Sequence, residues 1–256
     1  MIDFHNHILP NVDDGSKSLD ISIEMLTEAY NQGIKDVVNT VHYQHPKVED
    51  VDISIGFIQG KVLKLQNELK KRAIPIKIHI GAEVFYLPNL LTLKNDSLAT
   101  FGNGKYMLIE FQTNFIPNSH KNVLFNLKMN GITPIIAHPE RYYAVQKNIN
   151  LVYDWLNSGC IIQVDAGSLL GYMGKSAKKA SKIILEQNWC QVIGSDAHDN
   201  KKRNFVLSDG LKISKKLIGE NAIHLVNRHP KAILDGNPIE IGAIEKFNKS
   251  KRFFWS

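Results

Sequence analysis

The chain has 256 residues, 43% of them hydrophobic, and a formal net charge of +6 at pH 7. This length allows one large domain with a sizeable core. The basic balance favours a lysine-rich solvated surface over nucleic-acid binding, and no apolar run approaches the roughly 18 residues of a membrane span.

The cysteine content points to a reducing compartment. Cys160 and Cys190 are the only cysteines, and each opens an apolar run, as small buried hydrophobic residues do. A strand is predicted within the first few residues, which leaves no room for a signal peptide. We therefore expect a cytoplasmic protein.

Apolar periodicity, together with glycine or asparagine stops, predicts an alternation of strands and helices. The pattern begins with a strand over 2–7, a helix over 18–32, a strand over 36–41, a helix over 54–72 and a strand over 76–80. Residues 86–105 are rich in turn signals. The alternation then continues with strands over 106–109, 133–137, 160–164 and 190–194 and helices over 119–130, 149–158 and 175–187. A helical stretch over 205–226, a turn at 227–230 and a basic tail complete the chain.

Seven strands separated mainly by helices predict a parallel sheet, and closure into a barrel would protect its edges. The predicted fold class is α/β, a distorted seven-stranded (β/α) barrel. We expect one domain over residues 1–256, in which residues 243–256 form a basic C-terminal tail that frays.

Potential metal ligands stand at the ends of most predicted strands. Residues two apart on a strand face the same side, so His5 and His7 can converge on one centre, as can Asp196 and His198. Active sites of α/β barrels lie at the carboxyl ends of the strands. The strand-end residues are His5, His7, His42, Glu83, Glu110, His138, Asp196 and His198. Imidazole and carboxylate donors suit Mn²⁺, Fe²⁺ or Zn²⁺, and the lack of thiolates disfavours a structural zinc site.

Together these motifs resemble a known superfamily. They are Asp3-x-His5-x-His7, the turn Val12-Asp13-Asp14-Gly15, Glu83, Glu110, His138-Pro139-Glu140-Arg141 and Ser195-Asp196-x-His198. The combination resembles the PHP (polymerase and histidinol phosphatase) superfamily. It is most similar to the bacterial manganese-dependent protein-tyrosine phosphatases of capsule and exopolysaccharide loci, the CpsB/YwqE/CapC group.

The resemblance implies a PHP-type, TIM-like barrel with a trinuclear metal centre, and Mn²⁺ as cofactor with two or three ions, Fe²⁺ and Zn²⁺ being alternatives. It adds Asp14 to the metal ligands and implies that Arg141 and Arg203 hold the substrate phosphate. The second strand departs from the pattern, because it reads Thr40-Val41-His42-Tyr43 where the family has Thr-Pro-His-His. His45 is a possible substitute for the second histidine.

The function predicted from this resemblance is hydrolysis of protein phosphotyrosine by a metal-activated hydroxide. The expected partner is the C-terminal tail of a bacterial tyrosine autokinase that regulates capsular or exopolysaccharide synthesis. One alternative is a histidinol-phosphate or other small-molecule phosphatase, and another is a non-catalytic metal-binding regulatory module. A cysteine-based tyrosine phosphatase is excluded, because Ala166 and Asp196 stand where such an enzyme needs an arginine six residues after its cysteine.

Overall fold

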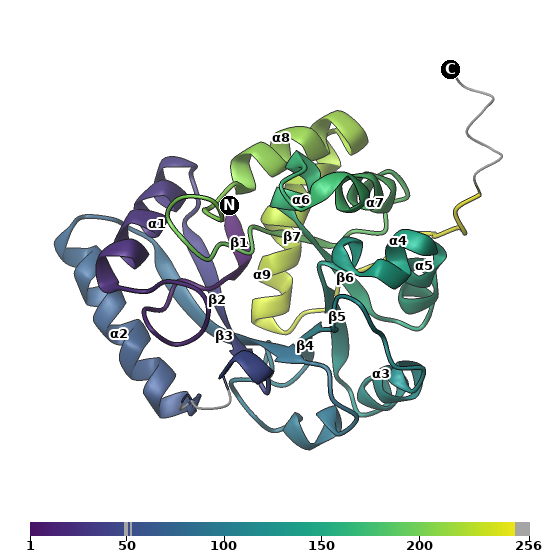
Figure 1. Ribbon diagram of the computed structural model, residues 1–256, viewed down its shortest axis with the longest axis horizontal. Helices are drawn as coiled ribbons and strands as arrows, with labels where there is room; N and C mark the ends of the chain where they lie inside the picture. Colours follow the sequence, from purple (N-terminus) through teal and green to yellow (C-terminus); the bar gives the residue numbers. More distant parts are fainter. Residues whose placement is uncertain (49–50, 52, 249–256) are drawn as a thin grey trace.

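Seven parallel strands, hydrogen-bonded in chain order, form the centre of the molecule in this computed structural model, which describes residues 1–48, 51 and 53–248 (Figure 1). The strands are β1 (Ile2–Asn6), β2 (Asp36–Tyr43), β3 (Lys77–Phe85), β4 (Tyr106–Glu110), β5 (Thr133–Ala137), β6 (Ile161–Asp165) and β7 (Val192–Gly194).

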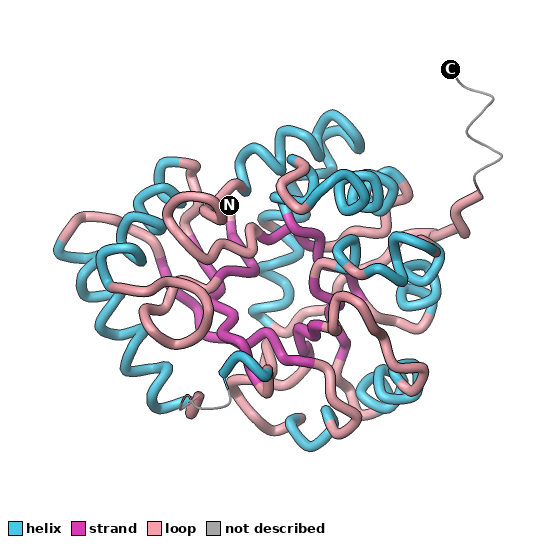
Figure 2. Tube along the Cα trace, in the orientation of Figure 1, coloured by secondary structure: helices cyan, strands magenta, loops and turns pink. Residues whose placement is uncertain are grey.

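Helices surround these strands, and loops join the two layers (Figure 2). The α-helices are α1 (Leu19–Asn31), α2 (Ile55–Lys71), α3 (His120–Met129), α4 (Tyr143–Lys147), α5 (Asn150–Asn157), α6 (Ala166–Leu170), α7 (Gly174–Glu186), α8 (Leu207–Ile218) and α9 (Arg228–Asp235). Four short 3₁₀ segments are η1 (Pro46–Val48), η2 (Leu90–Leu93), η3 (Pro139–Arg141) and η4 (Gly219–Val226).

The last strand returns to the first and nearly closes the barrel. The N–H of His7 donates to the carbonyl of Ala197 at 2.8 Å, and the N–H of Asp196 donates to the carbonyl of His5 at 2.7 Å. The carboxylate of Asp3 links the two strands. Its Oδ2 accepts from the N–H of Ser195 at 3.0 Å, and its Oδ1 accepts from the N–H of His5. The predicted seven-stranded (β/α) barrel is therefore confirmed.

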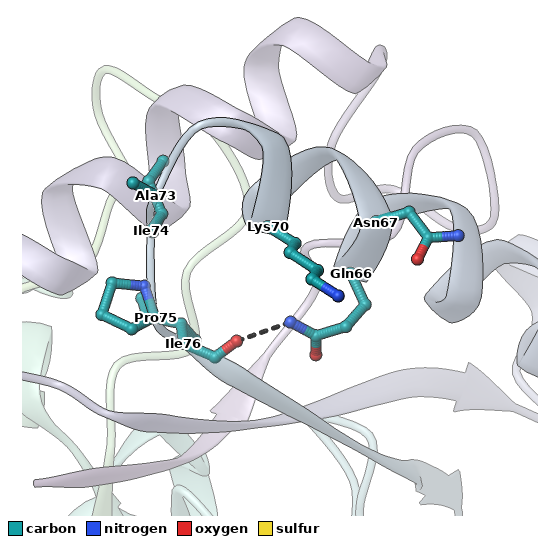
Figure 3. Close-up of a pocket in the computed structure, with 7 residues that line it drawn as sticks. All are labelled: Gln66, Asn67, Lys70, Ala73, Ile74, Pro75 and Ile76. Atoms are coloured by element: carbon teal, nitrogen blue, oxygen red, sulfur yellow. Dashed lines mark hydrogen bonds between the residues drawn. The ribbon is translucent and has the colours of Figure 1, made fainter.

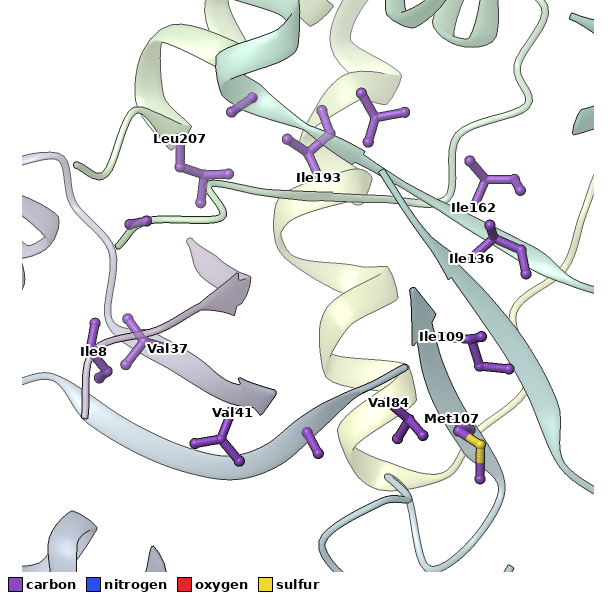
Figure 4. Close-up of a cluster of buried hydrophobic side chains, with 14 of the residues drawn as sticks. Ile8, Val37, Val41, Val84, Met107, Ile109, Ile136, Ile162, Ile193 and Leu207 are labelled. Carbon is purple, nitrogen blue, oxygen red and sulfur yellow. The ribbon is translucent and has the colours of Figure 1, made fainter. Parts of the chain in front are cut away.

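Alternate residues of the strands supply two separate cores. On β4, Met107 and Ile109 pack outward against the helices, whereas Tyr106 and Leu108 belong to the cluster inside the barrel. The outer cluster continues from strand to strand around the sheet (Figure 4). The inner cluster includes Ile233 of α9. Because side chains alternate between the two faces of a strand, every second strand residue lies inside the barrel. Ligand side chains on such positions therefore point into its interior.

The structure corrects two sequence expectations. The predicted turn at 227–230 is wrong, because α9 begins at Arg228 and its Pro230 lies in the first turn, where the missing N–H has no intrahelical partner to lose. The predicted helix over 205–226 is divided at Gly219, whose φ of 70° ends α8 before η4 begins.

Part of the expected C-terminal tail is described. The N–H of Phe247 donates to Oδ1 of Asn150 at 2.8 Å, so the chain is tied to α5 at that point. Residues 249–256, on which the expected fraying falls, lie outside the described residues. Among the helices described here, none combines the length and the apolar character that crossing a bilayer requires.

Candidate metal centre

The structure brings all nine residues predicted as ligands into one cluster at the carboxyl end of the barrel. Nε2 of His5 lies 3.3 Å from Nε2 of His7 and 3.2 Å from Oε2 of Glu83. Oδ1 of Asp196 lies 3.4 Å from each of these two imidazole nitrogens. These donor atoms come from β1, β3 and the segment after β7, so the cluster exists only in the folded barrel.

The other side of the cluster is built on two further histidines. Oδ1 of Asp14 lies 3.1 Å from Nε2 of His42 and 3.2 Å from Nε2 of His198. Four overlapping groups, each with donor atoms within 4.8 Å of one another, result: His7, Asp14, His42 and His198; His5, His7 and Asp196; His5, Glu83 and His138; and His42, His45 and Glu110.

Three of the imidazoles are held through Nδ1, which leaves Nε2 to face the cluster. Nδ1 of His5 lies 3.0 Å from Oε1 of Gln163, and Nδ1 of His7 lies 2.8 Å from Oδ2 of Asp13. Nδ1 of His198 lies 2.9 Å from the carbonyl oxygen of Asp196. Because each of these oxygens accepts, each Nδ1 must donate, and the lone pair of Nε2 then points inward. Metal-binding histidines are oriented in the same way.

Unsatisfied buried atoms show that this donor set fits a cation. Both ring nitrogens of His42 and Oε2 of Glu110 are buried and accept or donate no hydrogen bond among the described residues. Nδ1 of His42 lies 3.8 Å from that Oε2 and 3.2 Å from Oε2 of Glu83. Buried acceptors this close repel unless a proton or a cation lies between them. The residues present therefore fit a divalent metal centre.

The electrostatics of the cluster agree with that fit. Burial lowers the pKa of His5, but the carboxylates of Glu83 and Asp196 outweigh it and raise the pKa to about 9. Burial and the neighbouring Glu83 raise the pKa of Glu110 to about 8. Burial and Arg141 lower the pKa of His138 to about 4. In the metal-free cluster His5 and Glu110 therefore hold protons near neutral pH, which binding of divalent ions would release, whereas His138 is already neutral.

Close backbone packing fixes two of the histidines. A Cβ on Gly15 would lie 2.2 Å from the carbonyl oxygen of His7, and a Cβ on Gly194 would lie 2.6 Å from Cβ of His5. The backbone of two other candidates is strained, because φ is 29° at His138 and 49° at Asp196. Such conformations persist where the surroundings impose them, often at functional sites.

The two predicted phosphate-binding arginines meet at Asp196. Nη1 of Arg141 and Nη2 of Arg203 both donate to its Oδ2, the latter at 2.6 Å. The other oxygen of the same carboxylate faces His5 and His7. Asp196 therefore joins the imidazole cluster to two guanidinium groups that can receive a phosphoryl group.

Three residues near the site were not among the ligands predicted from the sequence, although His45 was named as a possible substitute for the family's second histidine. His45 stacks on His42 with 4.5 Å between ring centroids, and its Nε2 lies 3.6 Å from Oε2 of Glu110. Asp13 and Gln163 orient the imidazoles of His7 and His5, whose Nδ1 atoms they contact. Asp13 was visible as the first acid of the Val12–Gly15 turn, whereas no sequence signal distinguishes Gln163. The remaining histidines, His79, His120, His224 and His229, take no part in the four groups.

Tyr86 and Tyr142, which stand close after candidate ligands in the sequence, do not line a substrate pocket. Tyr86 and Tyr142 are buried, and the hydroxyl of Tyr142 accepts from the N–H of Phe111 and donates to the carbonyl of Ala137. Tyr43 instead lines a cavity of about 590 Å³ beside the cluster, together with His45.

A different cavity, of about 450 Å³, lies between α2 and the start of β3 (Figure 3). It is lined by Gln66, Asn67, Lys70 and residues 73–76, and Nε2 of Gln66 donates across it to the carbonyl of Ile76. None of its lining residues is a metal candidate, so the catalytic chemistry is not expected there.

Comparisons with known proteins identify related sequences. Residues 1–235 match the family model described as capsular polysaccharide synthesis, CpsB/CapC. The chain is 31% identical over 240 residues to tyrosine-protein phosphatase YwqE of Bacillus subtilis, with 93% of each protein covered. It is 32% identical over 241 residues to tyrosine-protein phosphatase CpsB of Streptococcus pneumoniae, which covers 91% of this chain and 98% of that protein.

Solved structures give the same result. A crystal structure from work on YwqE of B. subtilis and CpsB of S. pneumoniae, described as unique metal-dependent tyrosine phosphatases, matches with a TM-score of 0.90 and 30% identity, over 97% of this chain and all of that one. Histidinol phosphate phosphatase from Lactococcus lactis matches with a TM-score of 0.55 and 17% identity, over 86% of this chain and 93% of that one. This second likeness concerns the fold alone.

Proposed function

The chain belongs to the CpsB/CapC family of capsular polysaccharide synthesis, and from that membership we propose that it is a metal-dependent protein-tyrosine phosphatase. The whole chain would act as one phosphatase domain in the cytoplasm, where its two buried free thiols, Cys160 and Cys190, stay reduced. We further propose that its substrate is the tail of a bacterial tyrosine autokinase that regulates capsular or exopolysaccharide synthesis.

The metal ligands in this proposal are the nine clustered residues, with Mn²⁺ as the native ion and two or three ions bound. Three ions would match the groups around Asp14, Asp196 and Glu83. When bound, such ions supply a hydroxide nucleophile near neutral pH and positive charge for the phosphoryl oxygens.

The observation that carries the proposal is the double contact of Asp196. Its Oδ1 faces the imidazoles of His5 and His7, and its Oδ2 receives Arg203 at 2.6 Å as well as Arg141. The two guanidinium groups are therefore held at the edge of the metal cluster, where they can bind the phosphoryl oxygens of a substrate and stabilise charge that develops during transfer. The phenolate of a tyrosine leaves without strong protonation help, because the pKa of tyrosine is about 10.

The test compares wild-type protein with His5→Ala in Mn²⁺-dependent hydrolysis of a phosphotyrosine peptide. We expect the variant to lose turnover and bound metal while its circular dichroism spectrum stays native. His79→Ala is the matched control, because His79 pairs with Asp36 at the opposite end of the barrel strands. Near-normal turnover by His5→Ala would contradict the metal assignment.

Two further outcomes would contradict the proposed function. Efficient turnover of histidinol phosphate without turnover of the phosphotyrosine peptide would identify a small-molecule phosphatase. Purified protein that hydrolyses no aryl phosphate, whether or not it binds a transition metal, would identify a non-catalytic module.

A further inference from the structure

Three aromatic side chains project into solvent from consecutive loops at the catalytic end of the barrel. Phe115 follows β4, Tyr143 follows β5 and Tyr172 follows β6, and these side chains are 60%, 52% and 62% exposed. A single exposed aromatic residue is ordinary. Three exposed aromatic residues on successive loops around one candidate site are unusual and point to a binding surface.

Backbone contacts tie these loops to the phosphate-binding region. Tyr143 stands two residues after Arg141, and its N–H donates at 3.0 Å to the carbonyl of Thr113, two residues before Phe115. Gly167 is the second residue after β6, and a Cβ on it would lie 3.7 Å from Cδ2 of Tyr172, whose N–H donates to the Gly167 carbonyl at 2.9 Å. Figure 1 shows α4 and α6 next to β6. The aromatic loops therefore border the site from the side of β4, β5 and β6.

The loops and helix ends that follow β5, β6 and β7 at the carboxyl end of the barrel also carry an unbalanced positive charge. Their exposed charged residues are lysines, namely Lys147 at the end of α4, Lys175 at the start of α7, and Lys201 and Lys202. Nζ of Lys147 lies over the ring of Tyr143, 4.3 Å from its centroid.

The carboxylates of the same loops do not offset these lysines. Glu140, Asp165 and Asp196 are buried. Oδ1 of Asp199 accepts the N–H groups of Lys201 and Lys202 at 2.6 and 2.7 Å, and this carboxylate keeps its charge, but its single negative charge is set against four lysines. The surface presented to a partner is therefore aromatic and basic.

We propose that Phe115, Tyr143 and Tyr172, with the four lysines, form a docking surface for an acidic polypeptide segment that carries the phosphotyrosine. This inference rests on the proposed function, since it assigns the flanking chemistry of that substrate. Aromatic faces bind side chains and backbone on either side of the phosphotyrosine, and the lysines attract acidic flanks. A small aryl phosphate reaches only the metal cluster and the arginines.

The test measures kcat/KM for three substrates. They are a phosphotyrosine peptide with Asp and Glu flanks, the same peptide with Lys flanks, and p-nitrophenyl phosphate. For wild-type protein we expect the acidic peptide to exceed the basic one, with a difference that shrinks as salt is added. In Phe115→Ala/Tyr172→Ala, the ratio of kcat/KM for the acidic peptide to that for p-nitrophenyl phosphate falls about tenfold, a usual loss for truncated interface anchors.

The matched control is Phe125→Ala/Met129→Ala on α3. These side chains are 57% and 69% exposed and lie on the outer wall of the barrel, away from its carboxyl end. The control should leave the substrate ratio unchanged. An equal ratio for the wild-type and Phe115→Ala/Tyr172→Ala proteins, or equal rates on the two peptides, would overturn the docking surface alone. Failure of metal-loaded wild-type protein to hydrolyse any of the three substrates would instead overturn the proposed function on which it rests.

Discussion

Oδ2 of Asp13 lies 2.8 Å from Nδ1 of His7, and this contact decides which imidazole nitrogen faces the metal cluster. Since a carboxylate only accepts, Nδ1 carries the proton and Nε2 presents its lone pair. The same Asp13 oxygen accepts the backbone N–H of His42 at 3.1 Å, so one carboxylate positions two candidate ligands. The His7 imidazole holds the pKa of Asp13 below its usual range, overcoming the effect of burial.

Asp13→Ala should therefore weaken metal binding although Asp13 is not a proposed ligand. We expect the affinity for Mn²⁺ to fall about 10- to 100-fold, the usual cost of losing the partner of a ligating histidine. Calorimetric titration of the metal-free protein measures this directly. Asp209→Asn, an exposed carboxylate on α8, is the control, and equal affinities in the two variants would contradict the orienting role of Asp13.

His45 should contribute to the metal centre from its outer side. Because its ring stacks on His42 and faces Glu110, we expect His45→Ala to lower Mn²⁺ affinity by about tenfold, at the low end for supporting residues. The melting temperature in saturating metal should fall as well, since a ligand stabilises according to its affinity. His79→Ala, which removes a histidine paired with Asp36 at the opposite end of the strands, is the control. A wild-type affinity for His45→Ala would show that the contact is packing only.

Arg141→Ala should lower catalysis far more than metal binding. Removal of one preorganised donor to a developing charge costs about 2.7 to 4 kcal/mol in other enzymes, a loss of roughly 10²- to 10³-fold in rate. Arg141→Lys should recover only part of the lost catalytic rate, because an ammonium group cannot reproduce the planar fork of a guanidinium. Steady-state kinetics with an aryl phosphate measures both variants, and Arg72→Ala on the surface is the control. A change confined to metal affinity would refute the phosphate-binding role.

Glu140 should make stability depend on pH. Burial, and then the nearby Asp165, raise the pKa of Glu140 to about 8, and its Oε1 accepts the N–H of Asp165 at 3.0 Å. The native state therefore keeps a proton that the unfolded state releases near pH 4.5. Stability is fully present below that pH and falls as pH rises toward 8, by up to about 1.4 kcal/mol per pH unit.

The measurement compares urea unfolding of the metal-free protein at pH 5.5 and 8.5. Glu140→Gln keeps the acceptor and cannot ionise, so its free energy of unfolding should fall less than that of wild-type protein over this interval. Glu220→Gln, on an exposed side chain, should follow wild type. Parallel pH profiles for the wild-type and Glu140→Gln proteins would exclude a buried ionisation at this position.

The sequence predicted the barrel and the strand-borne ligands because both follow from local periodicity. His5 and His7 share a face since alternate residues of a strand do so, even though the register of β1 against β2 shifts between Asp3 and Asn6. Residues on loops follow no such period, so Asp14, Arg141 and Arg203 entered only through family resemblance.

His45 shows why some of the site lay beyond sequence reasoning. Its position depends on Gln44, which takes a φ of 55° directly after β2 and turns the chain back toward Glu110. Residues other than glycine rarely adopt that conformation, and nothing in the local sequence predicts it. Gln163 was missed for a different reason: it lies on a strand that seemed to carry no ligand, and only tertiary structure brings its amide to His5.

The closure of β7 onto β1 has a consequence for biosynthesis. One ligand group combines His5 and His7 from the start of the chain with Asp196, which is 189 residues beyond His7. A nascent chain on the ribosome cannot complete this group until the seventh strand has left the exit tunnel and paired with the first. Until then the early histidines lack their carboxylate partner. Metal binding at this group, and at the group that contains His198, would therefore wait until the barrel is nearly complete, whereas the two groups built around Glu83 and Glu110 need no residue beyond His138.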